Sequence, residues 1–307
     1  MIYIGNAPCS WGNVEWEDKS GSKLTAAGML DELTEAGYTG TELGDWGFMP
    51  TDPVALKAEL AARQLTMTGA FVPINFRNPA DHAAGETLAL NTAKLIAAVA
   101  DPALPPFVVL ADDCPDDTLR MRVAGRVTRD MMLKPEQWQI YAEGVNRVAR
   151  NVHRATGLRC VFHHHTGGFV ETADEIEVLL SLTDPQVVGL VFDTGHYAFG
   201  TGNPTAQGVM AALARFGERL WYVHFKDCDA SVAAQSRAQH WDYHTSVAHG
   251  IFCELGKGCV PFAEVAAWLR ARNYHGYITV EQDVLPGMGT PKASAIRNRR
   301  YLRDIGL

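Results

Sequence analysis

The chain has 307 residues, of which 47% are hydrophobic and 20% charged, and its formal net charge is -8. This composition is typical of a globular protein with a large buried core and excludes a disordered chain. An acidic chain lacks the clustered Lys and Arg that nucleic acid or an anionic membrane requires, so we expect neither as a partner and favour small neutral ligands.

Short apolar runs alternate along the chain with stretches of helical spacing. Strands are expected at 3–7, 40–43, 65–71 and 106–111, then in three segments ending at His163, Asp193 and His224, and finally at 277–281. Helices are expected at 23–36, 53–63, 84–100, 135–155, 172–182, 205–217, 261–272 and 291–304. Pro73 is expected to stop the third strand, because proline cannot donate to a strand ladder.

This alternation predicts the α/β fold class. Strands that run as continuous apolar segments are typical of parallel sheets covered by helices on their outer face. We expect a closed (β/α)8 TIM barrel that forms a single domain over residues 1–307, since no linker or repeat divides the chain. An open doubly wound sheet is the alternative, but it requires a Gly-rich phosphate turn after the first strand, and Gly5-Asn6-Ala7-Pro8 is not one.

Two long polar segments are expected at the mouth of this barrel. The first runs from Asp112 to Leu133, and a loop of that length is typically a functional lid or a mobile segment. The second begins at Cys228 and continues to Tyr243, and it is expected either to cover the mouth or to supply a subunit contact. A homo-oligomer is therefore left open.

The cysteines and the chain start indicate the compartment. The six cysteines contain no C-x-x-C pair, which is the pattern of reduced thiols, and we expect all of them to be structural or incidental, with Cys9 and Cys228 bordering the pocket. The N-terminus lacks the charged and apolar regions of a signal peptide, and no apolar run reaches the roughly 18 residues of a membrane span. We expect a cytoplasmic protein.

Four of the expected strands end in a polar residue that binds metals. They are His163, Asp193, His224 and Glu281. In a closed barrel the carboxyl ends of all strands meet at one mouth, so these side chains would converge. Imidazole and carboxylate ligands suit zinc, manganese, cobalt or iron better than calcium. The alternatives are a polar strand-to-loop junction for the histidine, a helix N-cap for Asp193 and a buried ion pair for Glu281.

Further candidates flank these four residues. His165 shares a strand face with His163, so both can point into the mouth while His164 turns toward the helices. His196 follows Asp193 by three residues, after a glycine that permits a sharp exit from the strand. We expect His165 and His196 to lie beside the substrate.

The remaining candidates would contact the substrate. Lys226 shares a strand face with His224 and is expected to hold a substrate oxygen, unless it only forms a surface ion pair with Asp227. Asp227 and Glu42 are expected to bind substrate hydroxyls, although a structural salt bridge is an equal alternative for Glu42. Trp11 and Trp46 are expected to form walls of the pocket, with core packing as the alternative.

A set of short motifs spreads over most of the chain. They are Trp11-Gly12, Gly40-Thr41-Glu42-Leu43-Gly44, Phe162-His163-His164-His165-Thr166-Gly167, Phe192-Asp193-Thr194-Gly195-His196, His224-Phe225-Lys226-Asp227, Gly250-Ile251-Phe252, Leu255-Gly256-Lys257-Gly258 and Val280-Glu281-Gln282-Asp283. Together they resemble the xylose-isomerase-like TIM-barrel superfamily of sugar isomerases and epimerases, and within it the inosose (2-keto-myo-inositol) dehydratase branch.

The resemblance implies a ligand set, a cofactor and a chemistry. The metal ligands would be His163, Asp193, His224 and Glu281, and the divalent metal ion would be manganese or cobalt, with zinc, magnesium or iron as alternatives. The substrate would be a small keto-polyol or ketose, and the pathway inositol catabolism. Epimerases of this fold usually carry Glu at the position of His163, whereas the dehydratases carry His.

Elementary mechanism agrees with a lyase. A divalent cation that bridges a ketone and its neighbouring hydroxyl acidifies the α-proton. Glu281 would act as base, and His165, His196 or Lys226 would supply the proton that accompanies the departing hydroxyl. An epimerase instead needs a second base on the opposite face, and the sequence offers only Glu42. We therefore expect a metal-dependent dehydratase, with a sugar isomerase or 3-epimerase, similar to hydroxypyruvate isomerase, as the alternative.

Two remote alternatives remain. An apurinic endonuclease, a hydrolase of the same superfamily, needs more metal ligands and a basic face for phosphates, which the charge of -8 opposes. A non-catalytic sugar-binding barrel would not need an aligned metal and base, and the metal content of the purified protein separates that case.

Overall fold

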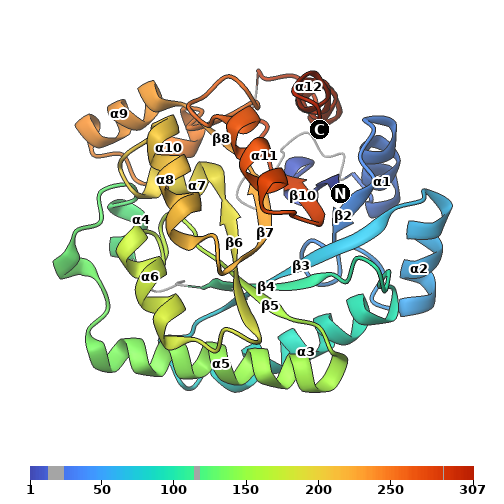
Figure 1. Cartoon of the computed structure of the whole chain (residues 1–307), viewed down its shortest axis with the longest axis horizontal. Coiled ribbons are helices and arrows are strands. Elements are labelled where there is room, and N and C mark those ends of the chain that lie inside the picture. The colour runs from blue at the N-terminus through green and yellow to red at the C-terminus, as the bar shows by residue number, and fades with distance from the viewer. Residues whose placement is uncertain (13–23, 114–117, 286) are drawn as a thin grey trace.

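A computed structural model of the chain describes residues 1–12, 24–113, 118–285 and 287–307 (Figure 1). Eight parallel strands form a closed barrel in the order β1-β10-β7-β6-β5-β4-β3-β2. These strands are β1 (Ile2–Asn6), β2 (Gly40–Glu42), β3 (Thr66–Ile74), β4 (Phe107–Asp112), β5 (Cys160–His163), β6 (Val188–Asp193), β7 (Leu220–Phe225) and β10 (Gly276–Val280). The predicted (β/α)8 barrel is confirmed.

Helices surround the barrel strands (Figure 1). One helix follows each strand on the outside: α1 (Ala26–Glu35), α2 (Pro53–Ala62), α3 (His82–Ala98), α5 (Pro135–Thr156), α6 (Ala173–Leu182), α8 (Ala206–Phe216), α11 (Phe262–Ala271) and α12 (Pro291–Asp304). Local signals set several of the helix starts. Both α2 and α12 begin at a proline, and the side chains of Asp52 and Thr290 accept a backbone N–H of the first turn.

Two apolar layers hold the barrel together. The larger one lies between the strands and the helices and includes Met29, Leu56 and Phe162. The smaller one fills the barrel interior and consists of Val109, Val161, Val191, Tyr222 and Tyr277, with Tyr3, Phe71, Leu104, Phe107 and Trp221 packed against it. Because side chains alternate across a strand, every second residue beyond this inner layer points toward the mouth.

The expectation that Pro73 stops the third strand was wrong. β3 continues to Ile74, and Pro73 lies opposite Ala111 of β4. The carbonyl of Ile74 faces β4, since it accepts from Asp113 N, so Pro73 faces the other side, toward β2. β2 ends at Glu42, opposite Gly69, and therefore leaves no ladder partner that needs an N–H from residue 73.

The segments at the mouth carry structure of their own. The part of 112–133 that is described contains α4 (Thr118–Arg122) and a 3-10 turn at Arg129–Met131, so the expected long loop is partly helical. Its Arg120 is buried and pairs with Glu175, with Nη1 3.0 Å from Oε1. The second segment forms α9 (Ala230–Gln239), α10 (Tyr243–Ala248) and a two-stranded antiparallel sheet of β8 (Asp227–Cys228) and β9 (Phe252–Cys253).

One side chain ties these mouth segments to each other. Arg126 Nη1 donates to the carbonyls of Trp241, at 2.8 Å, and of Ser236, at 3.3 Å. The second segment is therefore held against the first, and the two alternatives for it, covering the mouth or supplying a subunit contact, stay predictions. Of the cysteines, Cys9, Cys160, Cys228, Cys253 and Cys259 are free thiols, and Cys114 lies outside the described residues. Within the described part of the chain, no helix is both long and apolar enough to cross a membrane.

Candidate metal and active site

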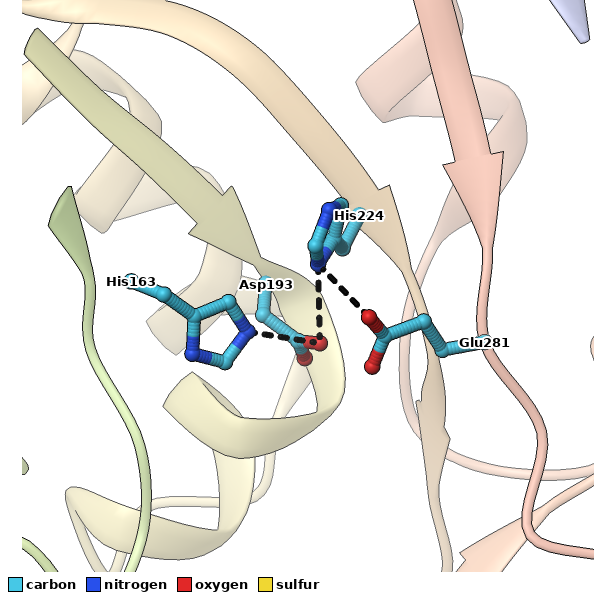
Figure 2. A group of neighbouring side chains, drawn as sticks. All are labelled: His163, Asp193, His224 and Glu281. Carbon is cyan, nitrogen blue, oxygen red and sulfur yellow. Dashed lines mark ion pairs between the residues drawn. The ribbon is translucent and has the colours of Figure 1, made fainter. Parts of the chain in front are cut away.

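The inward alternation of the strands brings the four predicted ligands to one layer. His163, Asp193 and His224 each follow an interior residue by two positions: Val161, Val191 and Tyr222. Glu281 lies four positions beyond Tyr277, one residue past the end of β10. Their side chains meet at the carboxyl end of the barrel, where the sequence placed them (Figure 2).

The ligand atoms of the four residues all lie within 4.8 Å of one another. His163 Nε2 is 3.7 Å from Asp193 Oδ2, and His224 Nδ1 is 4.0 Å from the same oxygen and 3.0 Å from Glu281 Oε1 (Figure 2). His163, Asp193 and His224 are buried, whereas the side chain of Glu281 is 12% exposed. Two imidazole nitrogens and two carboxylates around one centre form a donor set for a divalent cation.

Asp193 uses its two oxygens for different purposes. Oδ1 accepts the backbone N–H of His196 at 2.8 Å and so caps α7 (Thr194–Gly200). Oδ2 points at the centre of the cluster and has no hydrogen-bond partner among the described residues, and the same holds for His224 Nδ1. The N-cap and the ligand were alternatives in the sequence, and the geometry allows both roles at once. Buried polar atoms without partners are costly, so their convergence fits a bound cation.

Glu42 lies behind His224 and forms the structural salt bridge that was the alternative to a substrate contact. Its Oε1 accepts from His224 Nε2 at 2.8 Å and from the Tyr222 hydroxyl at 2.9 Å. Tyr222 is further held by Thr68 Oγ1 at 3.0 Å and by Thr279 Oγ1. A carboxylate on the far nitrogen of a ligand imidazole fixes its ring and its tautomer. The expected contact of Glu42 with substrate hydroxyls is replaced by this buried structural contact.

His164 turns out of the barrel, as the alternation requires. Its ring packs against Phe192 and Tyr197, and its Nε2 accepts the backbone N–H of Asp193 at 3.2 Å. Burial, together with His163, lowers the pKa of His164 to about 3, so the ring is neutral and can accept this bond. His164 therefore supports the strand that carries Asp193.

Lys226 is the cation of the site. Its Nζ is 3.2 Å from Glu281 Oε2, 3.7 Å from Asp283 Oδ2 and 3.3 Å from His196 Nε2. Burial lowers the pKa of Lys226, but Asp283, Glu281 and Asp193 outweigh it and hold the pKa well above its ordinary value. Lys226 is thus an ammonium inside the mouth and not part of a surface ion pair.

The two further histidines are neutral. Burial, His165 and Lys226 hold the pKa of His196 well below its ordinary value, so its ring is neutral. Its Nε2 lies 3.3 Å from Lys226 Nζ, and its Nδ1 lies 3.4 Å from both the backbone nitrogen and Oγ1 of Thr166. His165 lies against His196, with ring centroids 3.9 Å apart, and its Nδ1 donates to the Thr166 carbonyl at 2.8 Å. Burial and His163 lower the pKa of His165, which leaves its Nε2 as an acceptor.

Acidic groups outnumber cations around this centre. Burial raises the pKa values of Glu281 and Asp193. For Glu281, His224 and Lys226 reverse this effect and hold the pKa well below its ordinary value. For Asp193, His163 and Lys226 also leave a lowered pKa. Burial lowers the pKa of His224, but Glu281 and Glu42 raise it well above its ordinary value. Such a field attracts a cation.

Asp227 and Trp11, two of the predicted substrate contacts, are engaged within the protein, whereas the contact predicted for Trp46 stays a prediction. Asp227 is buried, and its two oxygens accept the backbone N–H groups of Cys228, Gly256, Gly258 and Val260 at 2.8–3.1 Å, so it organises the loop before α11. Trp11 is buried and donates through Nε1 to Glu32 Oε2 at 2.8 Å, which is the core-packing alternative. Trp46 is 43% exposed on the loop after β2. These placements oppose a substrate contact for Asp227 and Trp11.

Two residues of the site were not singled out from the sequence. Asp283 lies beside Lys226. It follows Glu281 by two positions, and the alternation of side chains along an extended segment could have predicted that both point to the same side. The ring of Phe252 packs on His196 at 4.7 Å between centroids and lies 4.7 Å from Lys226 Nζ. No periodicity connects Phe252 to the barrel strands, because it belongs to the extra two-stranded sheet.

The chain is similar to known proteins over nearly its full length. The family model for the xylose isomerase-like TIM barrel matches residues 30–305. Inosose dehydratase of Geobacillus kaustophilus is 30% identical over 97% of this chain and 93% of its own length.

Solved structures with the same fold include enzymes of different activities. The probable 3-DHS dehydratase AsbF of Bacillus anthracis superposes with a TM-score of 0.69 at 13% identity, covering 98% of both chains. The 3-keto-D-glucoside 4-epimerase YcjR of E. coli superposes with a TM-score of 0.68 at 16% identity, covering 99% of this chain and 100% of its own. At these identities the structures show the fold alone, whereas the family match shows descent: the chain belongs to the xylose isomerase-like TIM-barrel family.

Proposed function

We propose that this protein is a divalent-metal-dependent dehydratase that eliminates water from a keto-polyol of the inosose class. One observation carries the proposal: four ligand atoms lie within 4.8 Å of one another at the mouth, and a buried ammonium lies 3.2 Å from one of these carboxylates. The similarity to inosose dehydratase of G. kaustophilus over nearly the whole length supports this substrate class.

The residues fit the metal that the family resemblance implies. His163 and His224 would supply nitrogen, and Asp193 and Glu281 would supply oxygen, while Glu42 fixes the ring of His224 from behind. Mixed nitrogen and oxygen ligands suit manganese, cobalt, zinc or iron, and the resemblance favours manganese or cobalt. When bound, such a cation acts as a Lewis acid that makes the hydrogen next to the substrate carbonyl more acidic.

The protein groups divide the proton transfers between them. Glu281 takes the proton from the carbon next to the carbonyl, and the electron pair of that C–H bond becomes the new C=C bond. As it forms, the C–O bond to the neighbouring hydroxyl breaks, and the oxygen leaves as water with a proton from Lys226. Among the three candidate donors Lys226 is favoured, because it is an ammonium, whereas burial and neighbouring groups lower the pKa values of His165 and His196 and leave both rings neutral.

The alternative is an epimerase or isomerase acting on a ketose or inosose. Its first step would be the same proton abstraction, but the proton would return to carbon and no C–O bond would break. Within the superfamily that the sequence resembles, dehydratases carry His at the position of His163 and epimerases usually carry Glu. The strand-five residue therefore favours elimination.

One incubation separates these activities. Manganese-loaded protein is mixed with 2-keto-myo-inositol in deuterated water, while ultraviolet absorbance and product mass are recorded. We expect growing absorbance from an unsaturated ketone and a product lighter by one water. Deuterium in a saturated sugar without that absorbance would identify the epimerase instead. Protein treated with a chelator and the Asp193→Asn variant serve as controls, and turnover by both would refute the metal site.

A further inference from the structure

Asp283 presents a buried oxygen that is held only by a long ion pair. It lies two residues beyond Glu281, on the same side of the chain leaving β10, and its side chain is 13% exposed. Its Oδ2 is buried and has no hydrogen-bond partner among the described residues. It forms an ion pair with Lys226 Nζ at 3.7 Å, a separation longer than a direct hydrogen bond. A ligand atom that bridges the two groups would give this buried oxygen the hydrogen bond that the ion pair alone does not supply.

Lys226 has a donor to spare for the same ligand. An ammonium carries three N–H donors. One faces Glu281 Oε2 at 3.2 Å and another faces His196 Nε2 at 3.3 Å. The ring of Phe252, 4.7 Å from Nζ, is apolar and takes no conventional hydrogen bond. The third donor is therefore available on the side of Asp283, whose Oδ2 lies 3.7 Å away.

The separation of Lys226 Nζ and Asp283 Oδ2 favours one chemical group as a bridge. An oxygen atom about 2.8 Å from both Nζ and Oδ2 satisfies the 3.7 Å separation with normal hydrogen-bond lengths. A hydroxyl can accept from the ammonium and donate to the carboxylate at the same time. A carbonyl or ether oxygen can only accept and would face the lone pairs of Asp283, and a methylene leaves both groups unpaired.

We propose that Asp283 and Lys226 form a clamp for one secondary hydroxyl of the substrate, and that this clamp makes the site selective for polyhydroxylated rings over their deoxy analogues. The inference rests on the proposed function, since it places the clamp beside Glu281. It adds a substrate-binding role for Asp283 and a reason for specificity. The clamped hydroxyl is the one that leaves in the proposed elimination, so the N–H of Lys226 that holds it is also the one that supplies its proton.

Binding measurements test the clamp independently of turnover. Calorimetry measures the Kd of myo-inositol and of a panel of its monodeoxy analogues with the manganese-loaded wild type, Asp283→Ala and Asp283→Asn. The matched control is Asp304→Asn, an exposed aspartate in α12. Metal affinity and Tm are measured for each variant, so that a general loss of structure is recognised.

The expected result is a loss of discrimination. Wild type should bind one deoxy analogue roughly 10- to 100-fold more weakly than myo-inositol, because the buried groups lose their shared partner. Asp283→Ala should bind myo-inositol more weakly than wild type by a similar factor. Its Kd for that deoxy analogue should lie within about twofold of the wild-type Kd for the same analogue. Asp283→Asn keeps the shape and should lie between the two, while Asp304→Asn should match wild type.

The outcomes separate this inference from the proposed function. Equal discrimination in wild type and Asp283→Ala, or no discrimination in wild type, overturns the clamp even if 2-keto-myo-inositol is dehydrated. If wild type discriminates between myo-inositol and the deoxy analogue and Asp283→Ala does not, the clamp is supported even if no dehydration occurs. In that case only the proposed function fails.

Discussion

Removing the carboxylate of Glu42 should weaken metal binding although Glu42 is not a ligand. In Glu42→Ala, His224 Nε2 and the Tyr222 hydroxyl lose their common acceptor, Oε1, at 2.8 and 2.9 Å. Tyr222 keeps Thr68 and Thr279, so the unpaired group is mainly the His224 imidazole. Its ring would then be free to turn, and the Nδ1 atom that faces Asp193 and Glu281 would no longer be fixed.

The size of the effect follows from the bond that is lost. A hydrogen bond to a charged acceptor contributes about 1.5–3 kcal/mol. Partners behind a ligand histidine typically change metal affinity about 10- to 100-fold, or about 1.4–2.7 kcal/mol. We expect a loss in that range for Glu42→Ala. In Glu42→Gln the amide oxygen can occupy the place of Oε1 and accept both bonds, so its loss should be less than about tenfold.

Calorimetric titration of metal-free protein with manganese measures these affinities directly. Tyr222→Phe is the matched control, because it removes the other bond to Glu42 and leaves the His224 contact. Near-ultraviolet circular dichroism and Tm in chelator report whether the barrel is intact. If Glu42→Ala folds normally and binds manganese within twofold of wild type, the ring of His224 does not depend on Glu42 and the reasoning is refuted.

Four further predictions concern single groups. Asp193→Asn keeps the oxygen that caps α7 but loses the inward carboxylate, so Tm in chelator should stay near wild type while bound metal, measured by atomic emission, falls at least about tenfold. Arg120→Met leaves Glu175 buried without its cation and should lower the free energy of unfolding in urea by about 3–5 kcal/mol. Asp227→Asn turns an amide toward two backbone N–H groups and should cost roughly 1–3 kcal/mol for each, seen as a lower Tm; an unchanged Tm would contradict the assigned contacts. His163→Glu should reduce dehydration and raise proton exchange in deuterated water, and loss of both activities would leave the strand-five argument without support.

The barrel and the ligand layer followed from two periodicities in the sequence. Apolar runs separated by helical stretches defined the eight strands, and the polar residue that ended a run marked its carboxyl end. Alternation then placed His163 and His165 inside and His164 outside, as observed. Each of these inferences depends on the sequence of a single strand. None of them requires knowing which segments pack beside that strand in the fold.

Predictions that depend on which segments pack beside a strand were less accurate. Whether Pro73 stops β3 depends on where β2 ends, and the length of β2 is set by pairing rather than by β3 itself. Asp227 follows Lys226 directly and looks equally available for substrate, but the backbone of residues 256–260 folds around its carboxylate. Glu42 lies 182 positions from its partner His224, and nothing in the local sequence distinguishes that contact from a substrate contact.

The hydrogen bonds of the buried acids show which part each can play. Both oxygens of Asp227 are used by backbone N–H groups, so this residue can only hold a loop. Asp193 uses one oxygen for the helix cap and directs the other at the cluster centre, so the start of α7 and the position of a ligand are fixed together. Asp283 has an oxygen that meets neither a backbone N–H nor the cluster centre. Because burying a polar atom without a hydrogen bond costs free energy, these two oxygens distinguish Asp193, in the proposed cation site, and Asp283, in the proposed clamp, from the framework residue Asp227.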